Sequence, residues 1–226
     1  PAVAGVANQA PGRELTAFGG AESRPSFADY YRTCALKLDK TGYFKNRGLS
    51  DEVIRRFNLG FDDHYICGSD EQGMQILWLA AIIPLSDSAY LARNTDAHSA
   101  DRIRKQGPLE FFNRAVLERE GDIFITEGEF DALSLETLGF AALSLGGCGN
   151  ARHFVELLRS RQASRGVHLR QMFYVCLDSD EAGREAAALL LQGLRHLGLR
   201  CCSIDLAFPF KDINEALCHY PEGLRD

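Results

Sequence analysis

Apolar runs and amphipathic segments alternate regularly through the second half of the chain. From Gly121 onward, runs of branched and aromatic residues predict buried strands, and each is followed by a segment with helical spacing of apolar positions. Strands that alternate with helices of this length are typical of an α/β protein with a doubly wound, mostly parallel sheet. The predicted strands are DIFITE, FAALSLGG, QMFYVCLD and LRCCSIDLAF, and the predicted helices are GEFDALSLETLG, NARHFVELLRSR, EAGREAAALLLQGLRHLG and DINEALCHY.

The first half of the chain is less regular and predicts a smaller α+β subdomain. A helical pattern starts near Ser26, two short helical pieces follow in TGYFKNRGLSDEVIRRFNLGF, and the apolar run ILWLAAIIPL predicts a buried strand. A polar segment with several basic residues then extends from Arg93 to Gly107. We therefore expect a loose lead-in over residues 1–25, an N-terminal subdomain over 26–118, and an α/β domain over 119–226.

Composition narrows the class of protein. Of the 226 residues, 46% are hydrophobic and 25% are charged, as in soluble globular proteins, and no apolar run reaches the roughly 18 to 20 residues needed to cross a bilayer. The seven cysteines are odd in number and form no C-x-x-C pair, which favours reduced thiols, a cytoplasmic location and no structural zinc site. The chain starts without Met and without a signal peptide, and we interpret it as cut from a longer chain.

The net charge of −6 argues at first against a nucleic-acid partner. The charges are unevenly distributed, however. Up to Glu118 there are 14 Lys and Arg against 15 Asp and Glu, whereas from Arg119 onward there are 11 against 16. An acidic surface is the usual reason for such an excess, but a cation site needs the same carboxylates.

Four carboxylates of the second half follow predicted strands. Glu127 ends the first strand, with Asp131 four residues later, and the pair Asp178 and Asp180 ends the third. Because ligands of such sheets bind at the carboxyl ends of the strands, we expect these groups to converge on one edge. Hard divalent ions, Mg²⁺ or Mn²⁺, suit such a set of oxygen donors. Each carboxylate alone can equally be a helix cap, and Asp180 can serve that way.

The segments EGEFDALSL (127–135) and DSDEAGREAA (178–187) resemble the two signature motifs of the TOPRIM domain. This fold is shared by bacterial-type primases, topoisomerases, OLD-type nucleases and recombination proteins. The resemblance implies that Glu127 acts at the catalytic centre, as a metal ligand or as an acid or base. It also implies that Asp178 and Asp180 bind metal, with two ions during catalysis, and that Asp131 supports them.

The segment KDINEAL (211–217) resembles the Lys-Asp-x-Asn-Glu motif of phage primase-helicases and related mobile-element primases. The resemblance implies that Asp212 adds a carboxylate near the metals and that Lys211 supplies a cation for phosphate. A plain helix start, with Asp212 at the first turn, explains the same letters.

The first half resembles the segment that opens the polymerase core of bacterial, DnaG-like primases. There a helix is followed by a Tyr-x-x-x-Arg-Gly-Leu turn and then by a helix that ends in Phe-x-x-Gly. The residues that carry this match are Tyr43, Arg47, Gly48, Leu49, Phe57 and Gly60.

A second stretch of the first half, IPLSDSAYLARN and the basic RIRKQGP, resembles the region where primases place basic residues facing template and nucleotide. The resemblance implies this role foremost for Arg93 and Lys105. Arg102 and Arg104 are further candidates, although a solvated surface is the default interpretation of a charge run.

Taken together, these resemblances imply the TOPRIM-containing catalytic core of a DNA primase. Such an enzyme uses divalent metal ions to synthesise RNA primers from ribonucleoside triphosphates on a single-stranded DNA template. A replicative helicase, in the full-length protein or in trans, is the implied partner. The alternative is a non-catalytic TOPRIM module of a primase-helicase relative, which binds nucleic acid without synthesising primers.

Overall fold

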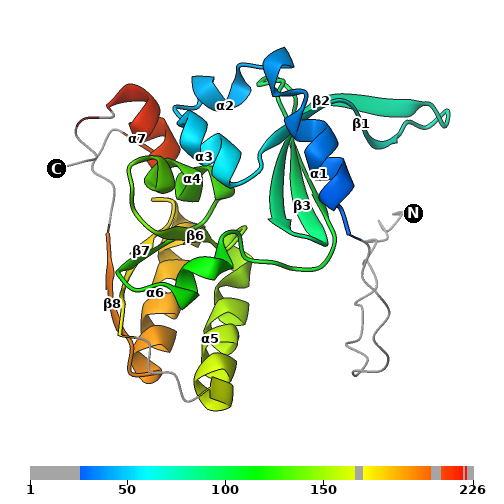
Figure 1. The fold of residues 1–226 in the computed structure, drawn as a ribbon. Coiled ribbons are helices and arrows are strands. Elements are labelled where there is room, and N and C mark those ends of the chain that lie inside the picture. Colours follow the sequence, from blue (N-terminus) through cyan, green and yellow to red (C-terminus); the bar gives the residue numbers. More distant parts are fainter. Residues whose placement is uncertain (1–25, 166–169, 205–209, 221, 223–226) are drawn as a thin grey trace, which may run out of the picture.

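The computed structural model describes residues 26–165, 170–204, 210–220 and 222. Within them the chain forms an antiparallel four-stranded sheet in its first half and a parallel four-stranded sheet in its second half (Figure 1). The mixed α/β fold predicted from the sequence is thereby confirmed. The expected lead-in over residues 1–25 and the end of the predicted strand LRCCSIDLAF lie outside the described residues.

Short helices precede the first sheet. The two helical pieces predicted around the Arg-Gly-Leu turn are present as α2 and α3, and the Ser50 hydroxyl caps α3 by accepting the Val53 N–H at 3.2 Å. The elements are α1 (Ala28–Ala35), the 3₁₀ turn η1 (Leu38–Lys40), α2 (Tyr43–Asn46) and α3 (Asp51–Arg56).

The antiparallel sheet has the order β1-β2-β3-β4. The predicted apolar strand lies within β2, and the polar segment from Arg93 to Gly107 contains the end of β3 and all of β4, which the pattern of apolar residues does not predict. β4 carries only one apolar residue, Ile103, because it is an edge strand with little buried surface. The strands are β1 (Gly60–Ser69), β2 (Gln75–Ser86), β3 (Ala89–Asn94) and β4 (Ile103–Gln106).

The parallel sheet has the order β6-β5-β7-β8, and its strands pair as the alternation of strands and helices predicts. A short 3₁₀ turn precedes β5, and another follows β6. The strands are β5 (Ile123–Thr126), β6 (Ala142–Ser144), β7 (Met172–Cys176) and β8 (Arg200–Ser203). The helices are α4 (Glu129–Thr137), α5 (Ala151–Arg165), α6 (Glu181–His196) and α7 (Ile213–His219), and the turns are η2 (Arg114–Glu118) and η3 (Cys148–Asn150).

Successive residues of the parallel strands face opposite, covered sides of the sheet. Ile125 and Val175 are fully buried in the cluster that includes α5 and α6. Phe124 and Tyr174 stack with ring centroids 4.9 Å apart and pack against the cluster that includes α4. Helices therefore cover both faces, and the doubly wound architecture is confirmed.

One hydrophobic cluster joins the two halves of the chain. It contains Phe44 and Leu91 from the first half together with Phe130 and Leu133 from α4. The rings of Phe44 and Phe130 stack with centroids 6.2 Å apart. The antiparallel sheet is thus fixed against α4, directly beside the carboxyl ends of the parallel strands. None of the helices within the described ranges has the length and apolar character needed to cross a membrane.

The packing of α1 on β1 generates a stability prediction. A Cβ atom at Gly60 would lie 2.5 Å from the Cβ of Cys34, whereas one at Gly68, in the same strand, would meet nothing within 4 Å. We expect Gly60→Ala to lower the free energy of unfolding by about 1–3 kcal/mol, because α1 must move away. Gly68→Ala should change it by less than about 0.5 kcal/mol. Urea unfolding of both variants measures the difference, and equal effects would contradict this account of the packing.

Candidate metal and nucleotide site

The pairing of β5 with β7 places the first two candidate carboxylates together. Thr126 lies opposite Cys176 in the parallel register, so Glu127 and Asp178 leave the sheet at neighbouring strand ends. The chain crosses from β6 on one side of β5 to β7 on the other, which makes this the topological switch point of the sheet. Ligands of doubly wound sheets bind at this position.

The loop that carries Asp178 is packed onto the first turn of α6. A Cβ atom at Gly183 would overlap the Asp178 carbonyl oxygen, which explains the glycine in the DSDEAG segment. Asp180 caps α6, because its Oδ1 accepts the Gly183 N–H at 2.8 Å. The capping interpretation of Asp180 therefore holds in the structure, and its carboxylate is exposed.

A pocket of about 340 Å³ lies between the two sheets at this edge. The antiparallel side and the Arg47 turn contribute cations to its walls, and the ends of the parallel strands with α4 and the start of α7 contribute mainly carboxylates. The charged residues that line it are Arg47, Arg93, Lys105, Lys211, Glu127, Glu129, Asp131, Asp178 and Asp212.

Arg93 and Lys105 reach this pocket because they project from the same face of the antiparallel sheet. Arg93 Nε donates to the Tyr43 hydroxyl at 3.1 Å, and its guanidinium lies 5.5 Å from the Phe130 ring centroid. Lys105 Nζ donates to the Gly146 carbonyl at 2.6 Å and lies 3.4 Å from a Glu129 oxygen. Lys105 thus bridges the two sheets across the pocket.

Arg102 and Arg104 are not among the residues that line this pocket. Arg104 neighbours Lys105 in β4 and therefore points to the opposite face. There its guanidinium lies 4.9 Å from the Trp78 ring centroid and pairs with Asp101. The structure does not bring these two candidates together with Arg93 and Lys105.

Arg47 is a pocket cation that charge patterning alone does not single out. Its guanidinium lies 4.6 Å from the Phe130 ring centroid, and its buried Nε has no hydrogen-bond partner among the described residues. The following Gly48 has φ +77°, a left-handed conformation that favours glycine. The feature of the sequence that points to Arg47 as a pocket residue is the Arg-Gly turn, because this turn directs the arginine side chain toward the pocket.

Burial, followed by neighbouring carboxylates, raises the pKa values of Asp178 and Asp131. Burial, and then the nearby Glu127 carboxylate, raises the pKa of Asp178 to about 6, although Lys211 Nζ, 3.7 Å away, partly offsets this. Burial and then Asp212 raise the pKa of Asp131 to about 7. For these two groups, burial and the neighbouring carboxylates outweigh the nearby cations.

The remaining predicted residues, Lys211 and Asp212, also lie at the pocket. Asp212 Oδ1 accepts the Glu215 N–H at 2.7 Å and so caps α7, which confirms the helix-start interpretation. The same carboxylate lines the pocket beside Asp178. Capping and proximity to the candidate site therefore occur together in this residue.

Glu127 has a thiol as its neighbour. Cys148 Sγ donates to Glu127 Oε2 at 2.8 Å, and burial together with that carboxylate raises the pKa of Cys148 to about 12. The thiol therefore stays protonated and donates. No sequence motif points to this contact, because the two residues come from different strand ends.

The chemistry of these donors fits a hard divalent cation. Several carboxylates gather at one edge, the pKa values of Asp131 and Asp178 are raised, and a cation would relieve the repulsion between these groups. Within the part of the chain that the structure describes, however, no three Asp, Glu, His or Cys side chains are close enough to form a preassembled ligand set. Side-chain rotation would have to accompany metal binding.

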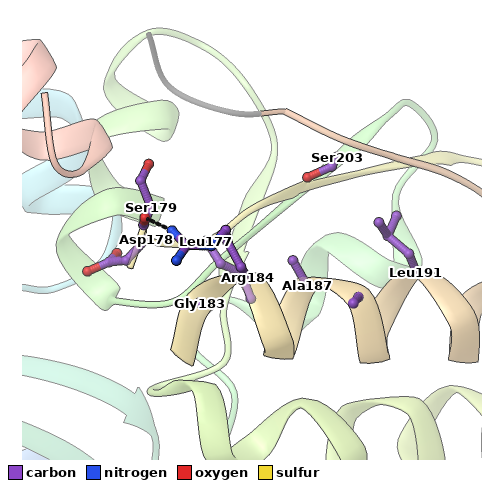
Figure 2. A pocket seen from close by; sticks show the side chains of 9 residues that line it. Leu177, Asp178, Ser179, Gly183, Arg184, Ala187, Leu191 and Ser203 are labelled. Carbon is purple, nitrogen blue, oxygen red and sulfur yellow. Dashed lines mark hydrogen bonds between the residues drawn. The ribbon is translucent and has the colours of Figure 1, made fainter. Parts of the chain in front are cut away.

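A second pocket, of about 440 Å³, lies on the other side of Asp178, between α6 and β8. Figure 2 shows Asp178 at one end of this pocket and Leu191 at the other, with Arg184 donating to the Ser179 carbonyl oxygen. Asp178 thus lines both pockets.

Comparisons with known proteins agree with this architecture. Residues 124–217 match the protein family described as Toprim-like. No curated protein matches the chain significantly. Among solved structures, the RNA polymerase domain of the Mycobacterium tuberculosis primase DnaG has a TM-score of 0.64 and 15% identity, covering 88% of this chain and 79% of that one.

Two further structures are similar. The zinc-binding and RNA polymerase domains of the Aquifex aeolicus primase give a TM-score of 0.60 and 21% identity over 87% of this chain. The primase fragment of the bacteriophage T7 primase-helicase gives 0.51 and 20% identity over 76% of this chain and 66% of that one. The chain spans 57% of the length of the Aquifex chain that it matches.

Residues 124–217 are therefore Toprim-like, on a doubly wound sheet with carboxylates at its switch point. More particularly, the chain has the fold of the RNA polymerase domain of the Mycobacterium tuberculosis primase DnaG, and the match covers 88% of this chain.

The raised pKa of Asp178 generates a pH prediction. The folded chain holds this proton more tightly than the unfolded chain, so stability falls as pH rises from about 4 through about 6. Asp178→Asn removes that loss. We expect the variant to be more stable than the wild type by about 1–2 kcal/mol at pH 8, after allowance for solvent screening, and nearly equal at pH 4. Urea unfolding at both pH values measures this, and a gain at pH 4 equal to that at pH 8 would refute it.

Proposed function

We propose that the chain is the catalytic core of a DNA primase, which joins ribonucleotides on a single-stranded DNA template in a reaction that depends on divalent metal ions. One observation carries the proposal. Four cationic and five acidic residues face one another in a single pocket, at the switch point of a Toprim-like sheet.

The carboxylates are the proposed metal ligands. Glu127, Asp178 and Asp180, with Asp212 at the rim, would hold Mg²⁺ or Mn²⁺. When bound, such ions lower the pKa of the attacking 3′-hydroxyl and neutralise charge on the transferred phosphate and the leaving pyrophosphate. Glu127, which follows β5 and lies beside Asp178, is the proposed acid or base, the role that the resemblance to the TOPRIM motif implies. Asp131, buried behind it, supports the set.

The cations are the proposed nucleotide and template contacts. Arg47 and Arg93 share the Phe130 ring, so their side chains are held in place before any ligand binds. This orientation reduces the entropy lost when a triphosphate binds. Lys105 would exchange its bond to the Gly146 carbonyl for a phosphate oxygen, and Lys211 would exchange its ion pair with Asp178 for another.

The wider partners follow from the same proposal. The template is single-stranded DNA, the substrates are ribonucleoside triphosphates, and the partner is a replicative helicase, in the full-length protein or in trans. The proposed location is the cytoplasm. Arg102 and Arg104 lie outside the pocket, and Arg104 pairs with Asp101 on the opposite face of the antiparallel sheet, so neither belongs to the proposed nucleotide contacts. The competing function is a Toprim-like module that binds nucleic acid without catalysis, which the lack of a preassembled ligand set within the described residues would favour.

Mutation of Glu127 tests the proposal. We expect Glu127→Gln to reduce primer synthesis at least about 100-fold without loss of folding, because it removes one negative charge from the metal site. Incorporation of labelled ribonucleotides on single-stranded DNA with Mg²⁺ or Mn²⁺ measures activity, and thermal unfolding checks the fold. Glu120→Gln, an exposed carboxylate before β5, is the matched control and should retain activity.

Two outcomes would count against the proposal. Full activity in the Glu127→Gln variant would show that the assignment of the catalytic centre is wrong. A wild-type chain that binds single-stranded DNA and Mn²⁺ but incorporates no ribonucleotide, even with a zinc-binding module added in trans, would favour the non-catalytic module.

A further inference from the structure

The short helix α7 is inserted between α4 and the Arg47–Gly48 turn. Ile213, Ala216 and Leu217 are buried, and a Cβ atom at Gly48 would lie 3.1 Å from a Leu217 methyl carbon. α7 therefore packs directly on the turn that aims Arg47 into the pocket. Figure 1 shows α7 beside α4, above the carboxyl ends of the parallel strands.

Asn214, on α7, connects both neighbours through hydrogen bonds. Its side-chain amide donates to the Arg47 carbonyl oxygen at 2.8 Å and to Ser134 Oγ, on α4, also at 2.8 Å. Its backbone N–H donates to Asp131 Oδ1 at 3.1 Å. The residue is only 2% exposed, so these bonds are made away from water.

Through these hydrogen bonds, Asn214 contacts two residues that line the proposed site, Arg47 and Asp131. One amide hydrogen fixes the main chain of Arg47, whose guanidinium is stacked on Phe130 and whose buried Nε has no partner among the described residues. The backbone N–H fixes Asp131, which lies beside the proposed metal ligands. The other amide hydrogen bonds to Ser134 on α4, the helix that also carries Asp131.

We propose that Asn214 is a positioning residue, which holds Arg47 and Asp131 at a fixed separation so that Arg47 meets the triphosphate of a bound nucleotide. The nucleotide part of this inference rests on the proposed function. The structural part, that the orientation of Arg47 depends on Asn214, does not.

The chemistry of the position explains why an amide is needed. Two acceptors, a carbonyl and a hydroxyl, converge on one buried side chain, and only Asn and Gln offer two N–H donors at a neutral NH₂ group. Asp has the same shape but no donor, and its charge would face Asp131 and Asp212. Ala removes both donors without adding charge.

The test follows the Arg47 side chain directly. In the ¹⁵N-labelled 226-residue chain, the Nε–Hε signal of Arg47 is identified by its loss in Arg47→Lys. We expect Asn214→Asp and Asn214→Ala to shift or broaden that signal while thermal unfolding by circular dichroism shows a folded protein. Ser134→Ala is the matched control, because it removes one bond of Asn214 and leaves the bond to Arg47, so the signal should stay in place.

A second measurement reports on nucleotide binding. We expect the dissociation constant of a fluorescent ribonucleoside triphosphate, in the presence of Mn²⁺, to rise about tenfold in both Asn214 variants and less than twofold in Ser134→Ala. In an Arg47→Ala background, the Asn214 substitutions should weaken binding less than twofold further, because their effect is transmitted through Arg47.

The outcomes separate the inference from the proposed function. An Arg47 signal that is unchanged in folded Asn214→Ala overturns the positioning role, whatever the activity. A moved signal without a change in nucleotide affinity overturns the link to the triphosphate. A wild-type chain that binds no nucleotide contradicts the proposed function, while the NMR comparison still decides whether Asn214 positions Arg47.

Discussion

The parallel pairing of β5 with β7 is the constraint on which the rest of the structure depends. It joins two strands separated by β6 and two helices in the sequence, and it brings their carboxyl ends to one edge. Glu127 and Asp178 are neighbours only because Thr126 lies opposite Cys176. Every other charged group of the pocket is placed relative to this pair, either by α4 and α7 or by the antiparallel sheet that packs against α4.

The pocket combines an electrostatic cost with a packing gain. Carboxylates crowd at the strand ends, where burial and mutual repulsion raise the pKa values of Asp178 and Asp131. The hydrophobic cluster around Phe130 offsets that cost and at the same time holds Arg47 and Arg93 over its ring. Carboxylates whose ionised form is destabilised, held on a well-packed framework, are typical of ligand-binding and catalytic sites.

The sequence predicted the parallel sheet well because each strand and helix of that half has a buried face with its own period. It did not predict β4, whose exposed edge leaves little apolar signal, nor the opposite orientations of Arg104 and Lys105, which depend on register. Asp212 both caps α7 and lines the pocket, whereas Asp180 caps α6 and is not among the residues that line the pocket. The contacts of Glu127 with Cys148 and of Asn214 with Arg47 join distant segments, and no local pattern encodes them.

The close approach of Gly183 to the Asp178 loop limits how the length of the chain can vary. No residue can be added or removed between β7 and the first turn of α6 without separating the carboxylate from the helix it rests on. The turn after α4, at Gly139, lies at the opposite edge of the sheet, where a Cβ atom would meet nothing within 4 Å. Insertions and deletions among relatives should therefore accumulate where the chain enters the strands, while the spacing from each strand to its acidic motif stays constant.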